Sequence, residues 1–453
     1  MTPSARPSVA VVGGGLAGIT AALDCAEAGA HVTLLEVRPR LGGAACSYER
    51  DAMLVDNGQH VFLRCCTAYR ALLDRLGTTS RTTLQERLSI PVVTPGGRTA
   101  WLRRSGLPAP LHLAGSLARY RHLRARERAA AFRAAAALAR LDLDDDALDR
   151  QRFGEWLSRR GQSPNAIEAL WDLIARPTLN LPAAEASLAM AAFVFKTGLL
   201  ERRDAGDIGF ANVPLSQVHA QPAARALEAL GAEVRMRHRV ERITVRAGGG
   251  FDIEGTATVE ADAVVVALPH DRLTSLLPPE ANVAPERIAR LGVSPIVNLH
   301  VVYERPVTRL PFAAAIRSPV QWVFDRTAAA GIGGQYLAMS LSAAEDEMAL
   351  DPDELIARNL AALEELFPAA RDTPVLNSFV TREHAATFRA APGAAELRPG
   401  PRTALGGLVL AGAWTDTGWP ATMEGAVRSG HAAAREVLGQ LRPGTRSLAE
   451  AVA

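Results

Sequence analysis

The sequence contains very little lysine, and no cysteine in its last 387 residues. Lys196 is the only lysine among 50 basic residues, so any mechanism that needs a lysine must use this one. The four cysteines, Cys25, Cys46, Cys65 and Cys66, lack the paired spacing of a metal site. Adjacent Cys65 and Cys66 would also form a poor disulfide. We therefore expect a reduced, cytoplasmic protein without a metal centre.

Long apolar runs and an excess of charge are absent as well. No stretch approaches the ~20 apolar residues of a membrane-spanning helix. The first twelve residues, MTPSARPSVAVV, hold too short an apolar run for a signal peptide. The formal net charge is only +2, so nothing indicates a nucleic-acid partner. At 453 residues, with 48% hydrophobic residues, the chain is expected to fold into two domains without crossing a membrane.

The segment SVAVVGGGLAGITAALDCAEAGAHVTLLE (8–36) predicts a strand, a glycine turn, a helix and a second strand. Its G-x-G-x-x-G turn permits close approach of a pyrophosphate to a helix N-terminus. Glu36 closes the second strand, where a carboxylate accepts the ribose hydroxyls and disfavours NADP. Because strand, helix and acid agree, we predict a dinucleotide site rather than a turn of structural glycines. The expected phosphate contacts are Gly13, Gly15, Leu16, Ala17 and Gly18.

The next segment, EVRPRLGGAACS (36–47), resembles the E-x-x-x-R-x-G-G-R motif of the flavin amine oxidase and phytoene desaturase superfamily. Arg40, Gly42 and Gly43 match the motif, whereas Ala44 stands where the family has its last arginine. The resemblance implies FAD rather than NAD as the cofactor. It also implies that the backbone of Val240, in a later strand, contacts the adenine.

The C-terminal segment GLVLAGAWTDTGWPATMEGAVRSGHAAAREVL (407–438) predicts a strand, a loop and a helix. The resemblance implies that the N-terminus of this helix faces the flavin, whose reduced form is stabilised by the helix dipole. A helix that merely packs through Gly425 and Gly430 is the alternative. Ala413 replaces the usual aspartate, and a lost charge-assisted hydrogen bond costs ~1.5–3 kcal/mol, so we expect weaker FAD binding. The cofactor contacts expected here are Gly412, Ala413, Thr422, Met423 and Glu424.

The pentapeptide DNGQH (56–60), with LPAPLHL (107–113) and 413–430, resembles the squalene-associated subgroup, the bacterial hydroxysqualene dehydroxylases of hopanoid synthesis. The resemblance implies that Gly58 lies beside the flavin. It also implies that an allylic hydroxyl leaves as water while reduced FAD supplies hydride, giving squalene. This reaction needs a proton donor and exclusion of water. The candidates for the acid or its relay are, in order, His60, Asp56, Asp416 and Glu424, and Gln59 is also a candidate catalytic residue.

Each of these residues also has a simpler interpretation. The side chains of a turn such as 56–58 often do no more than hydrogen-bond to the turn's own backbone. His60 is equally suited to a structural role. Amine oxidases often place a lysine near the flavin, for which only Lys196 is available. Some attach flavin through a late cysteine, and none follows Cys66, so we expect non-covalent FAD. Phytoene-type desaturation shares every cofactor motif, and Rab GDP-dissociation inhibitors use the same fold as prenyl-lipid escorts without flavin.

Basic residues concentrate in 98–140, which holds ten arginines and one acid, Glu127, among leucines and aromatics. This composition suits an interfacial helix on anionic lipid, from which a C30 isoprenoid substrate must be taken. We therefore expect a peripheral protein on the inner face of the cell membrane. The alternative is a solvated basic helix that pairs with the acidic run 141–149. No second dinucleotide loop is present, so the electron donor or reductase is not identified.

The resulting fold class is α/β, with a discontinuous Rossmann-type FAD-binding domain and an α+β substrate domain of the amine oxidase kind. Helices are expected in 151–205, strands in 297–306 and 335–342, and a helix in 353–367. The expected domain segments are 1–75, 208–288 and 401–440 for FAD binding, 76–207 and 289–400 for the substrate, and 441–453 as a tail.

Overall fold

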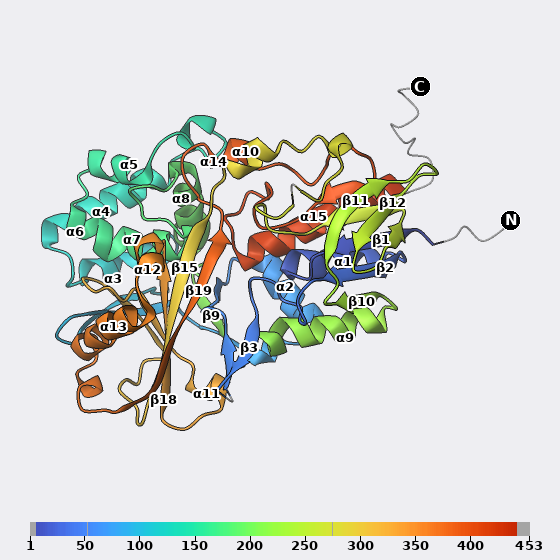
Figure 1. The fold of residues 1–453 in the computed structure, drawn as a ribbon. Coiled ribbons are helices and arrows are strands. Elements are labelled where there is room, and N and C mark those ends of the chain that lie inside the picture. The colour runs from blue at the N-terminus through green and yellow to red at the C-terminus, as the bar shows by residue number, and fades with distance from the viewer. Residues whose placement is uncertain (1–5, 52, 274, 442–453) are drawn as a thin grey trace.

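The valine-rich segment Ser8–Val12 forms β1, the middle strand of a parallel sheet, in the computed structural model, which describes residues 6–441 except 52 and 274. The strand order is β10–β2–β1–β14–β20. The strands come from three separated parts of the chain, which confirms the discontinuous nucleotide domain (Figure 1). The bounds of the other four are β2 His31–Glu36, β10 Glu233–Met236, β14 Ala263–Val266 and β20 Leu408–Leu410.

Both faces of this sheet are covered, as a parallel sheet requires. Val9 and Val11 point to a core shared with helices, whereas Ala10 and Val12 point to a core shared with a three-stranded ribbon. The helices are α1 Leu16–Glu27, α2 Thr67–Arg75, α9 Gln221–Ala229 and α15 Met423–Leu441. The antiparallel ribbon consists of β11 Val240–Val245, β12 Phe251–Gly255 and β13 Val259–Ala261.

A second, seven-stranded sheet has the order β19–β15–β18–β17–β16–β7–β8 and is antiparallel except between β16 and β7. Helix α13, Pro352–Leu366, covers one of its faces, as the sequence predicted. The expected strand 335–342 coincides with β18, whereas the expected strand 297–306 overlaps β15, which ends at Tyr303. The bounds are β7 Ser89–Thr94, β8 Arg98–Arg103, β15 Ser294–Tyr303, β16 Phe312–Ala315, β17 Trp322–Asp325, β18 Gln335–Ser342 and β19 Val375–Thr387.

A layer of helices lies against this sheet on the side away from the nucleotide domain (Figure 1). A π-helical turn at Ile167–Trp171 interrupts one of its helices, and another at Lys196–Leu200 ends a second one. Such turns insert an extra residue into a helix and are frequent beside functional sites. The helices are α3 Ala114–Ala118, α4 Ala125–Leu138, α5 Phe153–Arg159, α6 Pro164–Ala166, α7 Asp172–Leu179 and α8 Leu188–Phe195.

The basic segment 98–140, expected to hold an interfacial helix, is divided into several elements. Residues 98–103 form β8, which pairs with β7 in the large sheet. Pro108 and Pro110 then prevent a continuous helix, because proline lacks the N–H that a helix needs in its interior. Only a 3₁₀ turn, Leu111–Leu113, precedes the short α3, and α4 follows after a break.

Small sheets and short helices connect the two domains. The hairpin β3–β4 and the antiparallel sheet β5–β9–β6 lie between them. No helix within the described residues is long and apolar enough to span a bilayer. The expected domain boundaries stay predictions, and the expected tail 441–453 falls outside the described residues after position 441. The bounds are β3 Ser47–Arg50, β4 Met53–Asp56, β5 Val61–Leu63, β6 Thr82–Leu84, β9 Ile208–Ala211, α10 Pro285–Ala289, α11 Thr327–Ala330, α12 Glu345–Ala349 and α14 Ala394–Leu397.

Candidate active site

The glycine loop between β1 and α1 has no room for side chains at Gly13 and Gly18. Gly13 has a φ of +108°, and a Cβ there would lie 2.5 Å from the carbonyl oxygen of Ala267. A Cβ on Gly18 would lie 1.9 Å from the carbonyl oxygen of Gly13. The space in front of Gly15 is open, the nearest atom to a Cβ there being Gly43 Cα at 3.8 Å. The loop therefore leaves the helix N-terminus accessible to a pyrophosphate.

Glu36 lies at the end of β2 and is 6% exposed. Its two carboxylate oxygens accept the backbone N–H groups of Gly14 at 2.7 Å and Arg38 at 2.8 Å. An ionised carboxylate has about four acceptor sites, so sites remain for ribose hydroxyls. The N–H of His238 donates to the Glu36 carbonyl at 2.9 Å, which brings the start of β11 at Val240 to this edge of the sheet.

The second motif lies directly on the glycine loop. The N–H of Gly42 donates to the carbonyl of Gly14 at 2.8 Å. Arg40 contacts the Cys46 sulfur through Nη2 at 3.7 Å, while its Nε is buried and has no partner among the described residues. A buried guanidinium N–H without an acceptor fits a nearby phosphate oxygen. Ala44 contributes only a backbone carbonyl here, so Arg40 is the arginine available to the cofactor.

The C-terminal segment returns to this loop. Thr422 Oγ1 accepts the N–H of Gly425 at 3.1 Å, so Thr422 caps α15, and Met423 begins the helix. A Cβ on Gly430 would lie 2.4 Å from the carbonyl oxygen of Ala17, so α1 and α15 pack with their backbones in close approach. Two helix N-termini, far apart in sequence, are thereby placed in one region, as a flavin dinucleotide requires.

Sequence reasoning missed Arg398, which organises the loop before α15. The Arg398 side chain is buried, and it donates to the carbonyls of Trp414 at 3.1 Å, Thr415 at 2.5 Å and Trp419 at 2.7 Å. Burial lowers the pKa of this guanidinium to about 10. No motif surrounds it in the sequence, so no local signal could have identified it. Within the same loop Gly412 donates its N–H to a serine hydroxyl of α15 at 2.9 Å.

Glu424 has a structural task that the sequence did not indicate. Its carboxylate accepts the N–H groups of Ala68 at 3.1 Å and Tyr69 at 2.7 Å, and Arg428 Nε at 2.7 Å. It therefore caps the N-terminus of α2 and ties it to α15. Asp416, another candidate acid, is exposed and accepts only a backbone N–H two residues on. Glu424 lines the cavity, but its carboxylate is occupied by these three donors, and Asp416 does not line the cavity, so neither is placed as a free proton donor.

Asp56 ends β4 and is also fully engaged. One carboxylate oxygen accepts Ser47 Oγ at 2.7 Å and the N–H of Leu215 at 2.9 Å. The other lies 2.8 Å from Arg326 Nη2 in a buried ion pair. These partners occupy both carboxylate oxygens of Asp56, so the structure favours a structural role for it over proton transfer.

Asn57 fixes the turn that follows Asp56. Its side chain donates to the carbonyl of Ala44 at 2.9 Å and to Glu383 at 3.1 Å. Its own carbonyl accepts Asn298 Nδ2 at 3.0 Å. A Cβ on Gly58 would lie 3.2 Å from the same Asn298 nitrogen, so this position is closely packed. The turn is thus held from both domains, and the next two side chains are presented in a fixed direction.

Gln59 and His60 line a cavity at this turn. His60 Nδ1 donates to the carbonyl of Gly58 at 3.0 Å, because a carbonyl can only accept. This bond fixes the ring and leaves Nε2 available to a ligand. Gln59 Nε2 is buried and has no hydrogen-bond partner among the described residues. A buried, unpaired donor is costly, so it fits a ligand that carries an acceptor oxygen.

The cavity has a volume of about 620 Å³. It begins beside the flavin-binding segments and continues between the large sheet and the helical layer. Trp171, Leu173 and Ile174 line it, whereas Trp156 and Leu157 are core residues. Most lining side chains are apolar, so the space suits a long hydrocarbon next to the proposed flavin position. At the end beside the flavin-binding segments the cavity is lined by Leu16, Gly42 and Thr422, and in the helical layer by Leu111, Leu117 and Phe132.

Lys196 does not reach this cavity wall. Its Nζ donates to the carbonyl of Leu141 at 2.7 Å, and the cavity is lined instead by its neighbours Phe195 and Thr197. The one lysine of the chain is therefore not placed as the flavin-side lysine of an amine oxidase.

A sequence profile of the family described as flavin containing amine oxidoreductase matches residues 16–438. The chain belongs to this family. It is therefore an FAD-dependent oxidoreductase, and a non-catalytic escort is set aside. FAD fits the residues present: the glycine loop, Glu36, the unpaired Arg40 Nε and the N-terminus of α15 surround one region.

The chain is 28% identical to hydroxysqualene dehydroxylase from Rhodopseudomonas palustris over 444 residues, 95% of this chain and 98% of that protein. It is 24% identical to the chloroplastic/chromoplastic 15-cis-phytoene desaturase of Glycine max, over 95% of this chain and 79% of that one. Among solved structures, putrescine oxidase bound to putrescine has a TM-score of 0.71 at 21% identity, covering 96% of this chain and all of that one. Cyclohexylamine oxidase from Brevibacterium oxydans has a TM-score of 0.70 at 19% identity, with the same coverage. These structures share the fold.

Proposed function

We propose that this enzyme removes the allylic hydroxyl of hydroxysqualene and replaces it with hydride, giving squalene in bacterial hopanoid synthesis. The observation that carries the proposal is the pair Gln59–His60, two hydrogen-bonding side chains at the flavin end of a long apolar cavity. A hydrocarbon with one hydroxyl matches this distribution of polar and apolar groups. The similarity to a hydroxysqualene dehydroxylase over nearly the whole chain supports it.

In this proposal the two side chains divide the work on the leaving hydroxyl. Gln59 Nε2 donates to the hydroxyl oxygen and orients the carbon–oxygen bond. His60, held through Nδ1 by the Gly58 carbonyl, delivers a proton from Nε2 to the same oxygen, which then leaves as water. FAD, when bound, supplies the hydride that the resulting allylic cation accepts. The apolar walls exclude bulk water, which would otherwise trap that cation.

Phytoene-type desaturation is the second candidate, because an apolar cavity accepts a polyene equally well and phytoene desaturases are among the relatives. The unpaired Gln59 donor favours dehydroxylation, since a polyene offers no oxygen to it.

The test is anaerobic incubation of photoreduced enzyme with hydroxysqualene. We expect flavin absorbance near 450 nm to return while the lipid loses one oxygen atom, as read by product mass. In the parallel sample, oxidised enzyme receives phytoene. Reduced flavin that stays reduced with hydroxysqualene, together with bleaching of the oxidised enzyme by phytoene, would reverse the ranking of the two candidates.

A further inference from the structure

Three large apolar side chains are exposed where the cavity wall meets the protein surface. Leu107 is 53% exposed, Leu111 56% and Phe132 37%. Leu111 and Phe132 also line the cavity. Leu111 directly precedes α3, and α3 packs against α4, which carries Phe132. We call Leu107, Leu111 and Phe132 the cavity mouth, because Leu111 and Phe132 line the cavity and are also exposed, and Leu107 is exposed in the loop just before Leu111.

The chain around the cavity mouth carries an uncompensated positive charge. Residues 98–140 hold ten arginines and one glutamate, a net charge of +9, whereas the whole chain carries +2, so the remainder is acidic. None of these arginines forms an ion pair with the acidic run 141–149 in the described structure. Internal pairing of this stretch, the alternative considered from the sequence, is therefore not what the structure contains.

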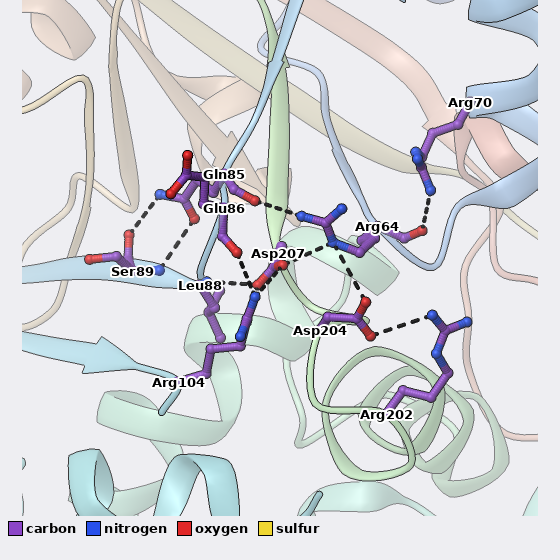
Figure 2. A network of polar contacts seen from close by, with 10 residues as sticks. All are labelled: Arg64, Arg70, Gln85, Glu86, Leu88, Ser89, Arg104, Arg202, Asp204 and Asp207. Atoms are coloured by element: carbon purple, nitrogen blue, oxygen red, sulfur yellow. Dashed lines mark hydrogen bonds and ion pairs between the residues drawn. The ribbon is translucent and has the colours of Figure 1, made fainter. Parts of the chain in front are cut away.

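Arg104 is the exception among these arginines (Figure 2). Its Nε lies 2.5 Å from Asp207, whose side chain is fully buried and also lies 2.9 Å from Arg64 Nε. This network anchors the base of the loop that carries Leu107 and Leu111. The other nine form no ion pair within the described residues: Arg98, Arg103, Arg119, Arg121, Arg124, Arg126, Arg128, Arg133 and Arg140.

We infer that the cavity mouth rests on an anionic lipid bilayer, so that the substrate passes from the membrane between α3 and α4 directly into the cavity. Apolar side chains at the opening enter the interface, and the arginines around them bind lipid headgroups. Two observations favour an anionic bilayer as the partner of this surface: the positive charge of residues 98–140, and the cavity lining that reaches the surface at Leu111 and Phe132. The identity of the lipid substrate rests on the proposed function, whereas the docking itself does not.

Vesicle binding tests the docking without reference to catalysis. Holoenzyme is sedimented at low salt with phosphatidylcholine vesicles that contain phosphatidylglycerol, and with neutral vesicles. We expect binding to the anionic vesicles that high salt releases. Leu111→Asp combined with Phe132→Asp should weaken it by about tenfold or more. Leu376→Asp is the matched control, because Leu376 is 61% exposed on β19, outside the cavity mouth, and should bind as the parent does.

The charge contribution has its own pair of variants. Arg119→Glu with Arg121→Glu should weaken binding to anionic vesicles by about tenfold and reduce its salt dependence, since both side chains are exposed beside α3. Arg371→Glu, exposed in a loop after α13, is the control. Unchanged flavin absorbance and thermal unfolding show that each variant is folded.

Comparing turnover of detergent-dispersed substrate with turnover of substrate in vesicles then tests whether the lipid enters the cavity from the membrane. The Arg119→Glu, Arg121→Glu variant, whose side chains do not line the cavity, should turn over detergent-dispersed hydroxysqualene as the parent does, and lose most activity on the same lipid in vesicles. If hydroxysqualene is not the substrate, both forms are inert while vesicle binding still discriminates the variants. Absence of vesicle binding at any salt overturns the inference. So does an equal loss in the Leu376 control, or a dimer in solution that the cavity-mouth variant dissociates without affecting vesicles.

Discussion

Asp56 and Arg326 form an ion pair across the interface of the two domains, with Oδ2 and Nη2 2.8 Å apart and side chains 5% and 10% exposed. Asp56 belongs to the hairpin beside the flavin region, and Arg326 follows β17 of the large sheet. Arg326 also donates to the carbonyl of Ala211, the last residue of β9. The pair thus connects three elements that meet behind the Gln59–His60 turn.

We expect Asp56→Asn to destabilise the protein rather than to abolish its chemistry directly. Removing one partner of a buried ion pair leaves the other charge uncompensated and costs ~3–5 kcal/mol. Urea unfolding measures this loss. Asp416→Asn, at an exposed carboxylate, is the control and should change stability by less than ~0.5 kcal/mol. A fully stable Asp56→Asn protein without turnover would instead make Asp56 the proton donor.

The cofactor half of the site could be predicted because its signals are local. Three glycines within six residues, followed by a helix and a strand-ending acid, specify a turn whose geometry depends on its own backbone. The structure adds the reason for two of them: side chains at Gly13 and Gly18 would collide with carbonyl oxygens. Glu36 is found at the strand end, where the spacing predicted it.

The structural partners of the acids could not be predicted, because each contact joins residues far apart in sequence. Asp56 and Arg326 are separated by 270 positions, and Glu424 and Tyr69 by 355. A carboxylate that caps a distant helix and one that donates a proton look identical in a sequence. Composition likewise suggested an interfacial helix within 98–140, but strand pairing and two prolines divide that segment into several elements.

Arg398→Met should loosen the loop before α15 and weaken FAD binding. Three carbonyls would lose their shared donor, at a cost of ~1–3 kcal/mol in stability. The same loop positions Ala413 and Thr422 at the cavity. Thermal unfolding of the apoprotein and FAD titration measure the two effects. Arg402→Met is the matched control, because Arg402 is 73% exposed and pairs only with Glu436. Equal FAD affinity in both variants would contradict a positioning role for Arg398.

Ala413→Asp should tighten FAD binding. Position 413 lines the cavity next to the flavin-binding segments, and the resemblance places an aspartate there in most of the superfamily. A restored charge-assisted hydrogen bond is worth ~1.5–3 kcal/mol, about ten- to a hundred-fold in the dissociation constant. Fluorescence titration of the apoprotein with FAD gives this constant. Ala413→Asn, which keeps the size without the charge, should gain less. Weaker binding by the aspartate variant would show that the segment holds the cofactor differently.

His60→Gln separates proton donation from the other tasks of this residue. Glutamine can still hydrogen-bond in the turn but cannot deliver a proton, so we expect reoxidation of reduced enzyme by hydroxysqualene to slow by about 10²–10⁴-fold. FAD affinity and vesicle binding should be unchanged. His122→Gln is the control, since His122 contacts the Val92 carbonyl and does not line the cavity.

The decisive comparison uses the allylic acetate of the same lipid, whose leaving group departs without being protonated. If His60 is the acid, the His60→Gln enzyme should convert the allylic acetate at a rate close to that of the parent enzyme. Its rate with hydroxysqualene should stay low. An equal loss on both substrates would mean that His60 positions the lipid, and Gln59 would then be tested in the same way. A normal rate on the alcohol would place the acid elsewhere in the cavity wall.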